Sequence, residues 1–250
     1  MINTVKILKH QGRQFIKDVS KVTLLPPFRG RPIISKEKVD ENELVSLCPT
    51  GAISSNPVKI DLGKCTFCGE CAFHFPNKIS FTTDYKIATN DRNNLIVRDG
   101  EDKPIELNPA VIRKEISSFF HGSLKLRQVS AAGDNSAELE LNAAGNVNFD
   151  MGRFGTEFVA SPRHADGIVI TGPVSRNMAE PLQICYDAVP DPKIIILCGV
   201  DAISGGIFAD SSALNREFLE KYKIDLYVPG NPPHPLTFIN GILELIRERK

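Results

Sequence analysis

Four cysteines in the first third of the chain have the type and spacing of a metal-binding site. Cys65, Cys68 and Cys71 stand at strict three-residue intervals, and Cys48 stands alone in front of Pro49. Thiolates are soft ligands that suit iron–sulfur centres and zinc. The four residues are therefore expected to act together as one four-thiolate site.

The spacing resembles that of bacterial two-cluster ferredoxins. There, each C-x2-C-x2-C run gives three ligands to one cluster, and the Cys-Pro of the other run gives the fourth. In this chain only one such set is complete, because the positions of the second set hold other residues: Lys38, Glu41, Leu44 and Phe75. The resemblance implies one 4Fe-4S cluster, held by Cys48, Cys65, Cys68 and Cys71.

Two other interpretations of the four cysteines are weaker. Structural zinc usually pairs two C-x2-4-C knuckles rather than a triple run with a remote Cys-Pro. A disulfide framework is typical of small secreted chains, whereas this chain has 250 residues and begins without the apolar core of a signal peptide. We therefore expect a reducing, cytoplasmic location and an iron–sulfur site.

The composition is that of an ordinary soluble protein. The apolar fraction is 42%, the charged fraction is 24% and the formal net charge is zero. A neutral chain gives no global indication of nucleic-acid binding, and we expect none. The longest apolar runs, such as residues 194–198, are far too short to span a bilayer.

Residues 1–26 are predicted to form a basic N-terminal arm. Among the first 35 residues, Asp18 is the one acid against seven lysines and arginines, and apolar residues interleave with them. The pattern is compatible with a solvated helix face. It is equally compatible with an arm that docks on a membrane surface or an acidic partner subunit.

The remainder is predicted to form two domains. Residues 27–109 hold the cysteines and short strand-like pieces, and we expect an α+β ferredoxin-like domain. Its last stretch, 90–109, is polar and turn-rich, which indicates a seam or surface hairpin before a helix at 109–121. Residues 110–250 alternate strands and helices, so we expect a flavodoxin-like α/β domain with a mainly parallel sheet.

The α/β pattern predicts where that domain would carry a site. Expected strands at 124–130, 167–171, 193–198 and 225–230 alternate with helices at 136–144, 175–186 and 236–248. Binding sites of parallel sheets lie at the carboxyl ends of the strands. That edge would gather the loops at 133–137, 172–175, 199–206 and 230–234.

Six motifs in residues 115–250 resemble one family in register. They are DMGRFG (150–155), SPRHAD (161–166), TGPVSRNM (171–178), PDPK (190–193), SGGIF (204–208) and VPGNPPHP (228–235). They resemble the small subunit of membrane-bound, energy-converting NiFe hydrogenases, including formate hydrogenlyase. They are also similar to the complex I subunit that holds the last cluster before quinone. The preceding domain resembles the ferredoxin subunit of the same complexes, so the chain looks like a fusion of two neighbours.

The resemblance implies partners but not the family's own cluster. The implied partners are a hydrogenase-like or complex I-like large subunit, membrane subunits of the same complex and a soluble ferredoxin, on the cytoplasmic face of the inner membrane. The family holds a proximal 4Fe-4S cluster through four cysteines. The corresponding positions here are Asp134, Ala137, Asp201 and Asn231. Cys185 and Cys198 are expected to be inert, buried thiols.

The altered positions leave two interpretations open. Asp134, Asp201 and Asn231 could line an oxygen-rich pocket for Mg²⁺ or Ca²⁺. The preferred interpretation is that hydrogen bonds or ion pairs fill the space, with partners drawn from nearby basic residues: Arg153, Arg163 and His164.

No nucleophile–base set indicates independent catalysis, so we expect a non-catalytic subunit of an oxidoreductase. One hypothesis is an electron-transfer subunit with a single 4Fe-4S cluster. The alternative is a structural or coupling subunit that has lost the relay to the large subunit.

Overall fold

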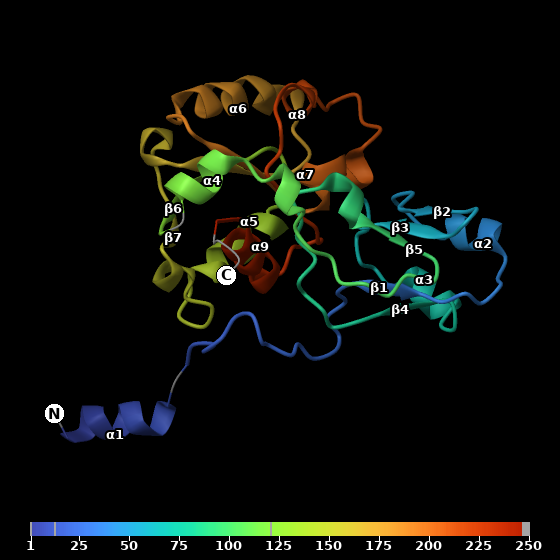
Figure 1. Ribbon diagram of the computed structural model, residues 1–250, viewed down its shortest axis with the longest axis horizontal. Coiled ribbons are helices and arrows are strands. Elements are labelled where there is room, and N and C mark those ends of the chain that lie inside the picture. Colours follow the sequence, from blue (N-terminus) through green and yellow to red (C-terminus); the bar gives the residue numbers. More distant parts are fainter. Residues whose placement is uncertain (1, 13, 121, 247–250) are drawn as a thin grey trace.

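A five-stranded parallel sheet between two layers of helices forms the larger part of the molecule (Figure 1). The computed structural model describes residues 2–12, 14–120 and 122–246. The sheet contains β6 (Leu124–Ser130), β7 (Thr156–Phe158), β8 (Gly167–Thr171), β9 (Ile194–Cys198) and β10 (Leu226–Val228). The predicted mainly parallel α/β sheet is thereby confirmed.

The strand order is β10-β9-β8-β6-β7, and every neighbouring pair is parallel. Counted from the first strand of the sheet, this is the 2-1-3-4-5 order of flavodoxin-like folds. The order reverses between β6 and β8. The loops that follow these two strands therefore diverge and leave a crevice at the carboxyl edge, where such folds place their sites.

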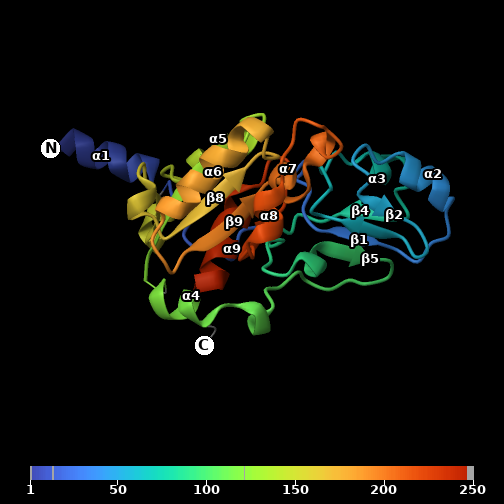
Figure 2. The same ribbon diagram turned by 90° about the horizontal axis from the view of Figure 1, so that it is seen from above.

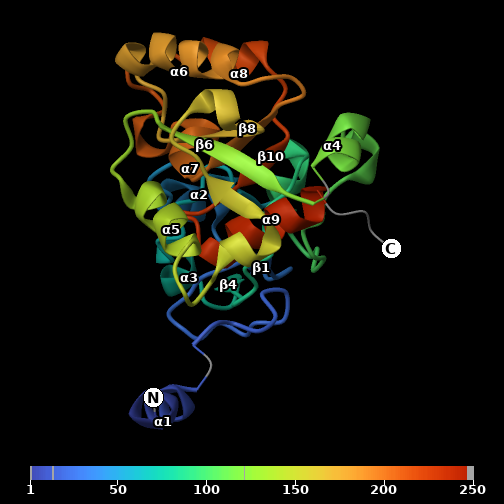
Figure 3. The same cartoon turned by 90° about the vertical axis from the view of Figure 1, so that its left-hand side faces the viewer.

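The helices cover the sheet on both faces (Figure 3). On one side lie α6 (Arg176–Ala188) and α8 (Glu217–Lys221), and on the other lie α5 (Ser136–Ala144) and α9 (Pro235–Ile246). Buried side chains alternate along the strands: Ile168 and Ile170 pack with the α6 side, whereas Val169 packs with the α9 side. Each fully buried isoleucine contributes about 1.5–3 kcal/mol, so the strands are firmly held.

Cys48, Cys65, Cys68 and Cys71 lie in a smaller unit. Figure 2 shows this unit beside the end of the sheet. This unit contains the antiparallel pair β1 (Pro32–Ile34) and β4 (Ile79–Phe81) and the antiparallel sheet of β2 (Ile53–Ser54), β3 (Lys59–Asp61) and β5 (Ile96–Arg98). Its helices are α2 (Glu41–Ser46) and α3 (Glu70–His74). The mixture of short strands and helices is an α+β arrangement, and its likeness to a ferredoxin stays a prediction.

The two units share a core and backbone hydrogen bonds. Leu62 and Cys65 belong to the same buried cluster as Ile203, which follows β9 in the short helix α7 (Val200–Ser204). Gly63 lies at this contact, where a Cβ would lie 2.7 Å from the Arg92 guanidinium carbon and 2.8 Å from Ile203 Cγ2. Further along, Thr89 and Tyr227 exchange two backbone hydrogen bonds of 3.0 and 2.8 Å.

Several boundaries differ from the sequence-based expectations. The stretch expected as a polar seam contains β5 and a 3-10 turn (Arg92–Leu95), because Val97 is buried and pairs with Ile60. The helix expected at 109–121 is broken into a 3-10 turn (Pro109–Val111) and α4 (Lys114–Phe119); residue 121 lies outside the described residues. The closing helix ends at Ile246 in the described chain, so the expected residues 247–248 lie outside it.

The remaining short elements are 3-10 turns at Met151–Phe154, Pro162–His164 and Gly206–Phe208 and the N-terminal helix α1 (Ile2–Gln11). Figure 1 shows α1 apart from the rest, and it has no buried residue. Within the described ranges, every helix is too short or too polar to cross a bilayer.

The break before α4 has a physical cause in a buried ion pair. Arg113 adopts an extended conformation, and its Nε and Nη2 donate to the two carboxylate oxygens of Asp225, each at 2.8 Å. The Asp225 side chain is only 2% exposed, and it also accepts from the Ile195 N–H at 2.9 Å. The pair thus ties the linker to β9 and to the segment before β10.

Replacing Arg113 with alanine should lower the free energy of unfolding by about 3–5 kcal/mol, because Asp225 would remain as a buried charge without its cation. Urea unfolding followed by circular dichroism measures the change. Arg163→Ala is the matched control, since Arg163 is at the surface and takes no part in this pair. Equal unfolding midpoints for the two variants would contradict this account of the linker.

Candidate functional site

The four predicted cysteines converge on one cavity. Cys48 follows α2, Cys65 and Cys68 lie in the loop between β3 and α3, and Cys71 lies within α3. All four line the same cavity, whose other walls include apolar residues from three segments: Leu47, Ala52, Ile53, Ile60 and Phe81. The structure therefore brings the whole predicted set together.

The loop that carries Cys65 and Cys68 is shaped by tight turns. Asp61 begins it by accepting hydrogen bonds from the N–H groups of Gly63, at its carboxylate, and of Cys65, at its carbonyl. Phe67 has a φ of 55° and Gly69 a φ of 84°, so the chain turns twice in the left-handed region between consecutive cysteines. These turns wrap the backbone around the sulfur atoms.

Backbone amides point at two of the sulfur atoms. The Ala52 N–H donates to Cys48 Sγ over 3.2 Å, and the Phe67 N–H donates to Cys65 Sγ over 3.4 Å. Arg29 Nη1 in turn donates to the Phe67 carbonyl at 3.1 Å, which braces the loop from outside. Such amide donors favour the thiolate over the thiol, and hydrogen bonds to sulfur also tune the potential of a bound cluster.

Burial makes two of the four thiols, those of Cys65 and Cys71, harder to ionise. Burial raises the pKa of Cys65 to about 12 and that of Cys71 to about 11, and the neighbouring cysteines add to both shifts. Mutual repulsion of four thiolates is relieved only by a positively charged group between them, because a bound metal deprotonates its thiol ligands. The donor set is therefore chemically suited to a metal centre.

Across the described ranges, no group of three or more His, Cys, Asp or Glu residues is placed to hold one metal ion. A tetrahedral zinc site needs all four sulfurs about 2.3 Å from one ion. In a 4Fe-4S cluster each thiolate binds a different iron atom, so a cluster does not require the four sulfurs to meet around one ion.

Cys68 is the one exposed cysteine of the four. Phe73, two residues beyond Cys71, is 79% exposed on α3, whereas Cys65 and Cys71 are buried. The site thus has a closed side toward the core and an open side at Cys68.

A second group of predicted residues meets at the carboxyl edge of the parallel sheet. Asp134, Ala137, Asp201 and Asn231 line one small cavity, together with Cys198 and Glu138. The juxtaposition agrees with the position of the fold's crevice, since Asp134 follows β6 and Gly172, which also lines the cavity, follows β8. No thiol stands at these four positions, and Cys198 supplies the single sulfur of this cavity.

The acids of this cavity have local partners. Asp134 Oδ1 accepts from the Ser136 N–H at 2.9 Å and from its hydroxyl at 2.6 Å, and these bonds lower the pKa of Asp134. Sequence reasoning missed Glu138, whose Oε1 accepts from the hydroxyls of Ser130 and Thr171 at 2.6 and 2.7 Å. The sequence feature that could have identified Glu138 is its position as the acid in the first turn of the helix predicted at 136–144.

The basic partners predicted for these acids were wrong. Arg153 instead donates to the Ile16 carbonyl and lies over the rings of Phe15 and Phe154. Arg163 and His164 lie at the surface on the 3-10 turn that precedes β8.

The cation beside Asp201 is Arg216. Burial and the nearby Asp134 raise the pKa of Asp201, and Arg216 opposes that shift. Its guanidinium donates to the carbonyls of Ala202 and Ile203 at 2.8 and 3.0 Å, and so holds the end of α7. Arg216 lies outside all of the motifs, which explains why pattern reasoning passed over it.

The two remaining cysteines are buried or half-buried thiols. Burial raises the pKa of both Cys198 and Cys185. Cys198 is completely enclosed in β9, at the base of the cavity at the sheet edge. Raised pKa values and burial are the properties of unreactive cysteines.

A cavity of about 200 Å³ lies between the two groups of residues. Phe67 of the cysteine loop and Asn231 of the sheet edge both line it, as do Arg29 and His234. The His234 ring meets Phe28 and Phe149 edge-on at 5.2 and 5.8 Å, and its Nδ1 accepts from the Leu236 N–H at 3.1 Å. Burial lowers the pKa of His234 to about 4.

Comparison with known proteins gives one family. The sequence profile of the NADH ubiquinone oxidoreductase 20 kDa subunit matches residues 135–245. A probable membrane-bound hydrogenase subunit, mbhJ, of Pyrococcus furiosus is 33% identical over 129 residues, which cover 52% of this chain and 77% of that protein. An NADH-quinone oxidoreductase subunit of Heliobacterium modesticaldum is 44% identical over 108 residues, covering 43% of this chain and 62% of that relative.

Several other curated relatives are also named as NADH-quinone oxidoreductase subunits, and the chain spans less than two thirds of their length. Among solved structures, the membrane-bound sulfane sulfur reductase, an archaeal respiratory membrane complex, contains a chain with 31% sequence identity. The match covers 50% of this chain and 69% of that one, with a TM-score of 0.44.

The environment of His234 gives a pH-dependent prediction. A folded-state pKa near 4, against about 6.5 in the unfolded chain, means that the unfolded state takes up the proton first as the pH falls. His234 therefore stabilises fully above about pH 6.5, and we expect a loss of about 1–2 kcal/mol between pH 7 and pH 5. A His234→Asn variant should lack this part of the pH dependence in urea unfolding. His74→Asn, at an exposed histidine, is the control. If His234→Asn leaves the slope of the unfolding free energy against pH unchanged, the prediction is contradicted.

Proposed function

Because the chain belongs to the family of the NADH ubiquinone oxidoreductase 20 kDa subunit, we propose that it is the electron-transfer subunit of a membrane-associated oxidoreductase. The assembly would be hydrogenase-like or complex I-like, since relatives bear both kinds of name. The chain would act as a non-catalytic subunit. The observation that carries the proposal is the convergence of Cys48, Cys65, Cys68 and Cys71 on one cavity.

We propose that these four cysteines hold one 4Fe-4S cluster. The fit rests on the full set of soft donors, the amide groups directed at Cys48 and Cys65 and the apolar walls of the cavity. Such a cluster, when bound, supplies one-electron transfer. The protein's own contributions are to bury Cys65 and Cys71, to cover Cys48 in part, and to leave Cys68 open as the side of approach for an electron donor.

The sheet edge is proposed to lack the family's proximal cluster. Asp134, Ala137, Asp201 and Asn231 provide no thiolate, and Cys198 alone cannot substitute for a set of four. The hydrogen bonds of Asp134 and Glu138 give the polar groups of this cavity local partners. The carboxyl edge would therefore serve as an interface rather than as a redox station.

The proposed partners follow from family membership. They are the large subunit and the membrane subunits of the same assembly, with a soluble ferredoxin as electron donor and no role for nucleic acid. Some relatives are named as parts of membrane-bound enzymes, and we propose a peripheral position on the cytoplasmic face of the membrane.

A structural or coupling subunit is the second candidate function. It is favoured by one observation, namely that the sheet-edge cavity has no set of thiols with which to pass an electron onward. The large subunit of the assembly distinguishes the two functions, because retained nickel-binding cysteines favour electron transfer and their absence favours a coupling role.

Anaerobically purified protein should contain about four iron atoms and a matching amount of acid-labile sulfide per chain, because one four-cysteine site is present. Cys68→Ser should remove most of the iron, whereas Cys185→Ser, the matched control, should retain it. Eight irons per chain would contradict the absence of a second cluster. Zero iron, or zinc instead, would contradict the cluster itself.

Restoring cysteines at the sheet edge tests the second half of the proposal. The combined change Asp134→Cys, Ala137→Cys, Asp201→Cys and Asn231→Cys should raise the iron content to about eight per chain if only the ligands were lost. The matched control is Cys198→Ser in the same variant, which should keep the added iron. A correctly folded quadruple variant with four irons would show that the cavity has also changed shape.

A further inference from the structure

Arg29 lies against the cysteine loop, although it belongs to the segment before β1. Its Nη1 donates to the Phe67 carbonyl at 3.1 Å. A Cβ on Gly69 would lie 2.7 Å from Arg29 Nε, so the arginine side chain occupies the space that the missing side chain of Gly69 leaves. Phe67 and Gly69 are the sequence neighbours of Cys68. The positive charge of Arg29 is therefore placed beside the exposed member of the cysteine set.

The backbone around Arg29 is held from two sides. The Gly30 N–H donates to the Thr82 carbonyl at 2.7 Å, directly after β4. On the other side, the Phe28 ring meets the ring of His234, from the α/β half, edge-on at 5.2 Å. Arg29 is thus anchored between the two units, whereas a cation on a free surface gains little from any one position.

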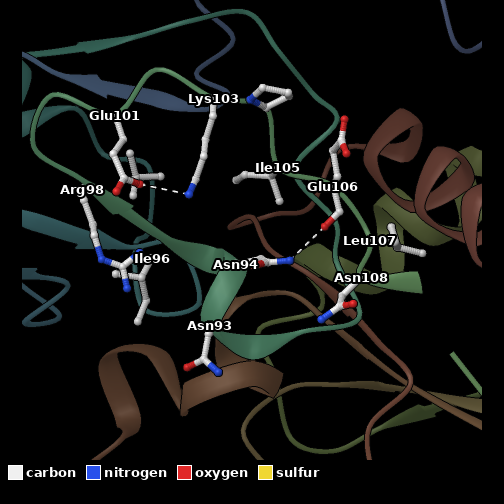
Figure 4. Close-up of a pocket in the computed structure, with 12 residues that line it drawn as sticks. Asn93, Asn94, Ile96, Arg98, Glu101, Lys103, Ile105, Glu106, Leu107 and Asn108 are labelled. Atoms are coloured by element: carbon white, nitrogen blue, oxygen red, sulfur yellow. Dashed lines mark hydrogen bonds and ion pairs between the residues drawn. The ribbon is translucent and has the colours of Figure 1, made fainter. Parts of the chain in front are cut away.

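Several other cations of the cysteine-bearing unit are neutralised by carboxylates. Figure 4 shows Lys103 directed at Glu101, and 3.2 Å separate Lys103 Nζ from Glu101 Oε2. Arg92 pairs in the same way with Asp61, with 2.6 Å between Nη2 and Oδ2. Such pairing cancels most of the field that these cations would exert on their surroundings.

Arg29 has no such carboxylate partner among the residues that the structure describes. Glu70, the acid in the wall of the cysteine cavity, is bonded to His74 Nε2 at 3.1 Å. The cavity of about 200 Å³ that Arg29 lines on its other side has no acid among its lining residues. The cation that contacts the cysteine loop therefore keeps its field.

We infer that Arg29, through its charge, raises the reduction potential of the cluster proposed at the four cysteines. The inference rests on that proposed cluster and assigns a role to a residue that is not one of its ligands. An added electron makes the site behind the loop more negative, and a fixed cation beside it stabilises the more negative state. Net charge and exposure around the sulfur atoms are among the factors that set such potentials.

The midpoint potentials of three variants test this inference, with EPR-monitored redox titration as the measurement. Arg29→Gln removes the charge, and its potential should fall by about 59 mV, the equivalent of about a tenfold change for a one-electron couple. Arg29→Lys keeps the charge and should stay close to the original potential. Lys64→Gln is the matched control and should also leave the potential nearly unchanged, because Lys64 is an exposed cation next to Cys65 whose side chain has no bond to the loop in the described structure.

Each of the other outcomes overturns the inference. Equal potentials for the original chain and Arg29→Gln would show that the charge does not act on the cluster. An equal fall in Arg29→Lys would assign the effect to hydrogen-bond geometry, and an equal fall in Lys64→Gln would assign it to net charge alone. Loss of iron from Arg29→Gln would assign Arg29 to holding the loop together. Iron missing from the original chain would instead refute the cluster proposal itself, so the two failures are distinguishable.

Discussion

The shared apolar core between the cysteine-bearing unit and the parallel sheet is the constraint on which the rest of the structure depends. Leu62, Cys65 and Phe67 are buried in the same cluster as Ile168 of β8 and Ile203 of α7. This packing positions the cysteine loop against the end of the sheet. Without it, the two halves of the chain would have no fixed relation, and a site in one could not serve an interface on the other.

Local turns of the backbone shape the cysteine site, once the shared core has placed its loop against the sheet. Left-handed backbone at Phe67 and Gly69 curls the loop, and Arg29 braces the Phe67 carbonyl from the segment before β1. Burial opposes ionisation of Cys65 and Cys71, so their thiolates are costly in the absence of a positively charged partner. A cation-rich cluster would relieve that cost, so binding and local order are expected to support one another.

Much of the α/β half could be predicted from periodicity. The continuous apolar runs that became β8 and β9 are buried on both faces, and β6 and α5 lie where the pattern placed them. The polar stretch around β5 could not be predicted in the same way. A three-residue strand with one buried side chain, Val97, has too little periodicity to be distinguished from a turn.

The site residues divide in the same way, into those identified by local spacing and those that depend on contacts between distant segments. The cysteine set was evident because its spacing is local. The partners of the sheet-edge acids were not, because Arg216 reaches α7 from a different loop, and Arg153 is occupied by Ile16 and two aromatic rings. Contacts between segments far apart in sequence depend on tertiary packing, which residue spacing does not encode.

Mössbauer spectroscopy of the ⁵⁷Fe-enriched protein tests the central claim most directly, since it reports every iron atom and the type of centre that holds it. The account predicts that all iron belongs to a single four-iron cluster, and that Cys48→Ser abolishes its spectrum whereas Cys185→Ser does not. A spectrum from two distinct iron–sulfur centres, or iron that survives the loss of Cys48 unchanged, would contradict the account.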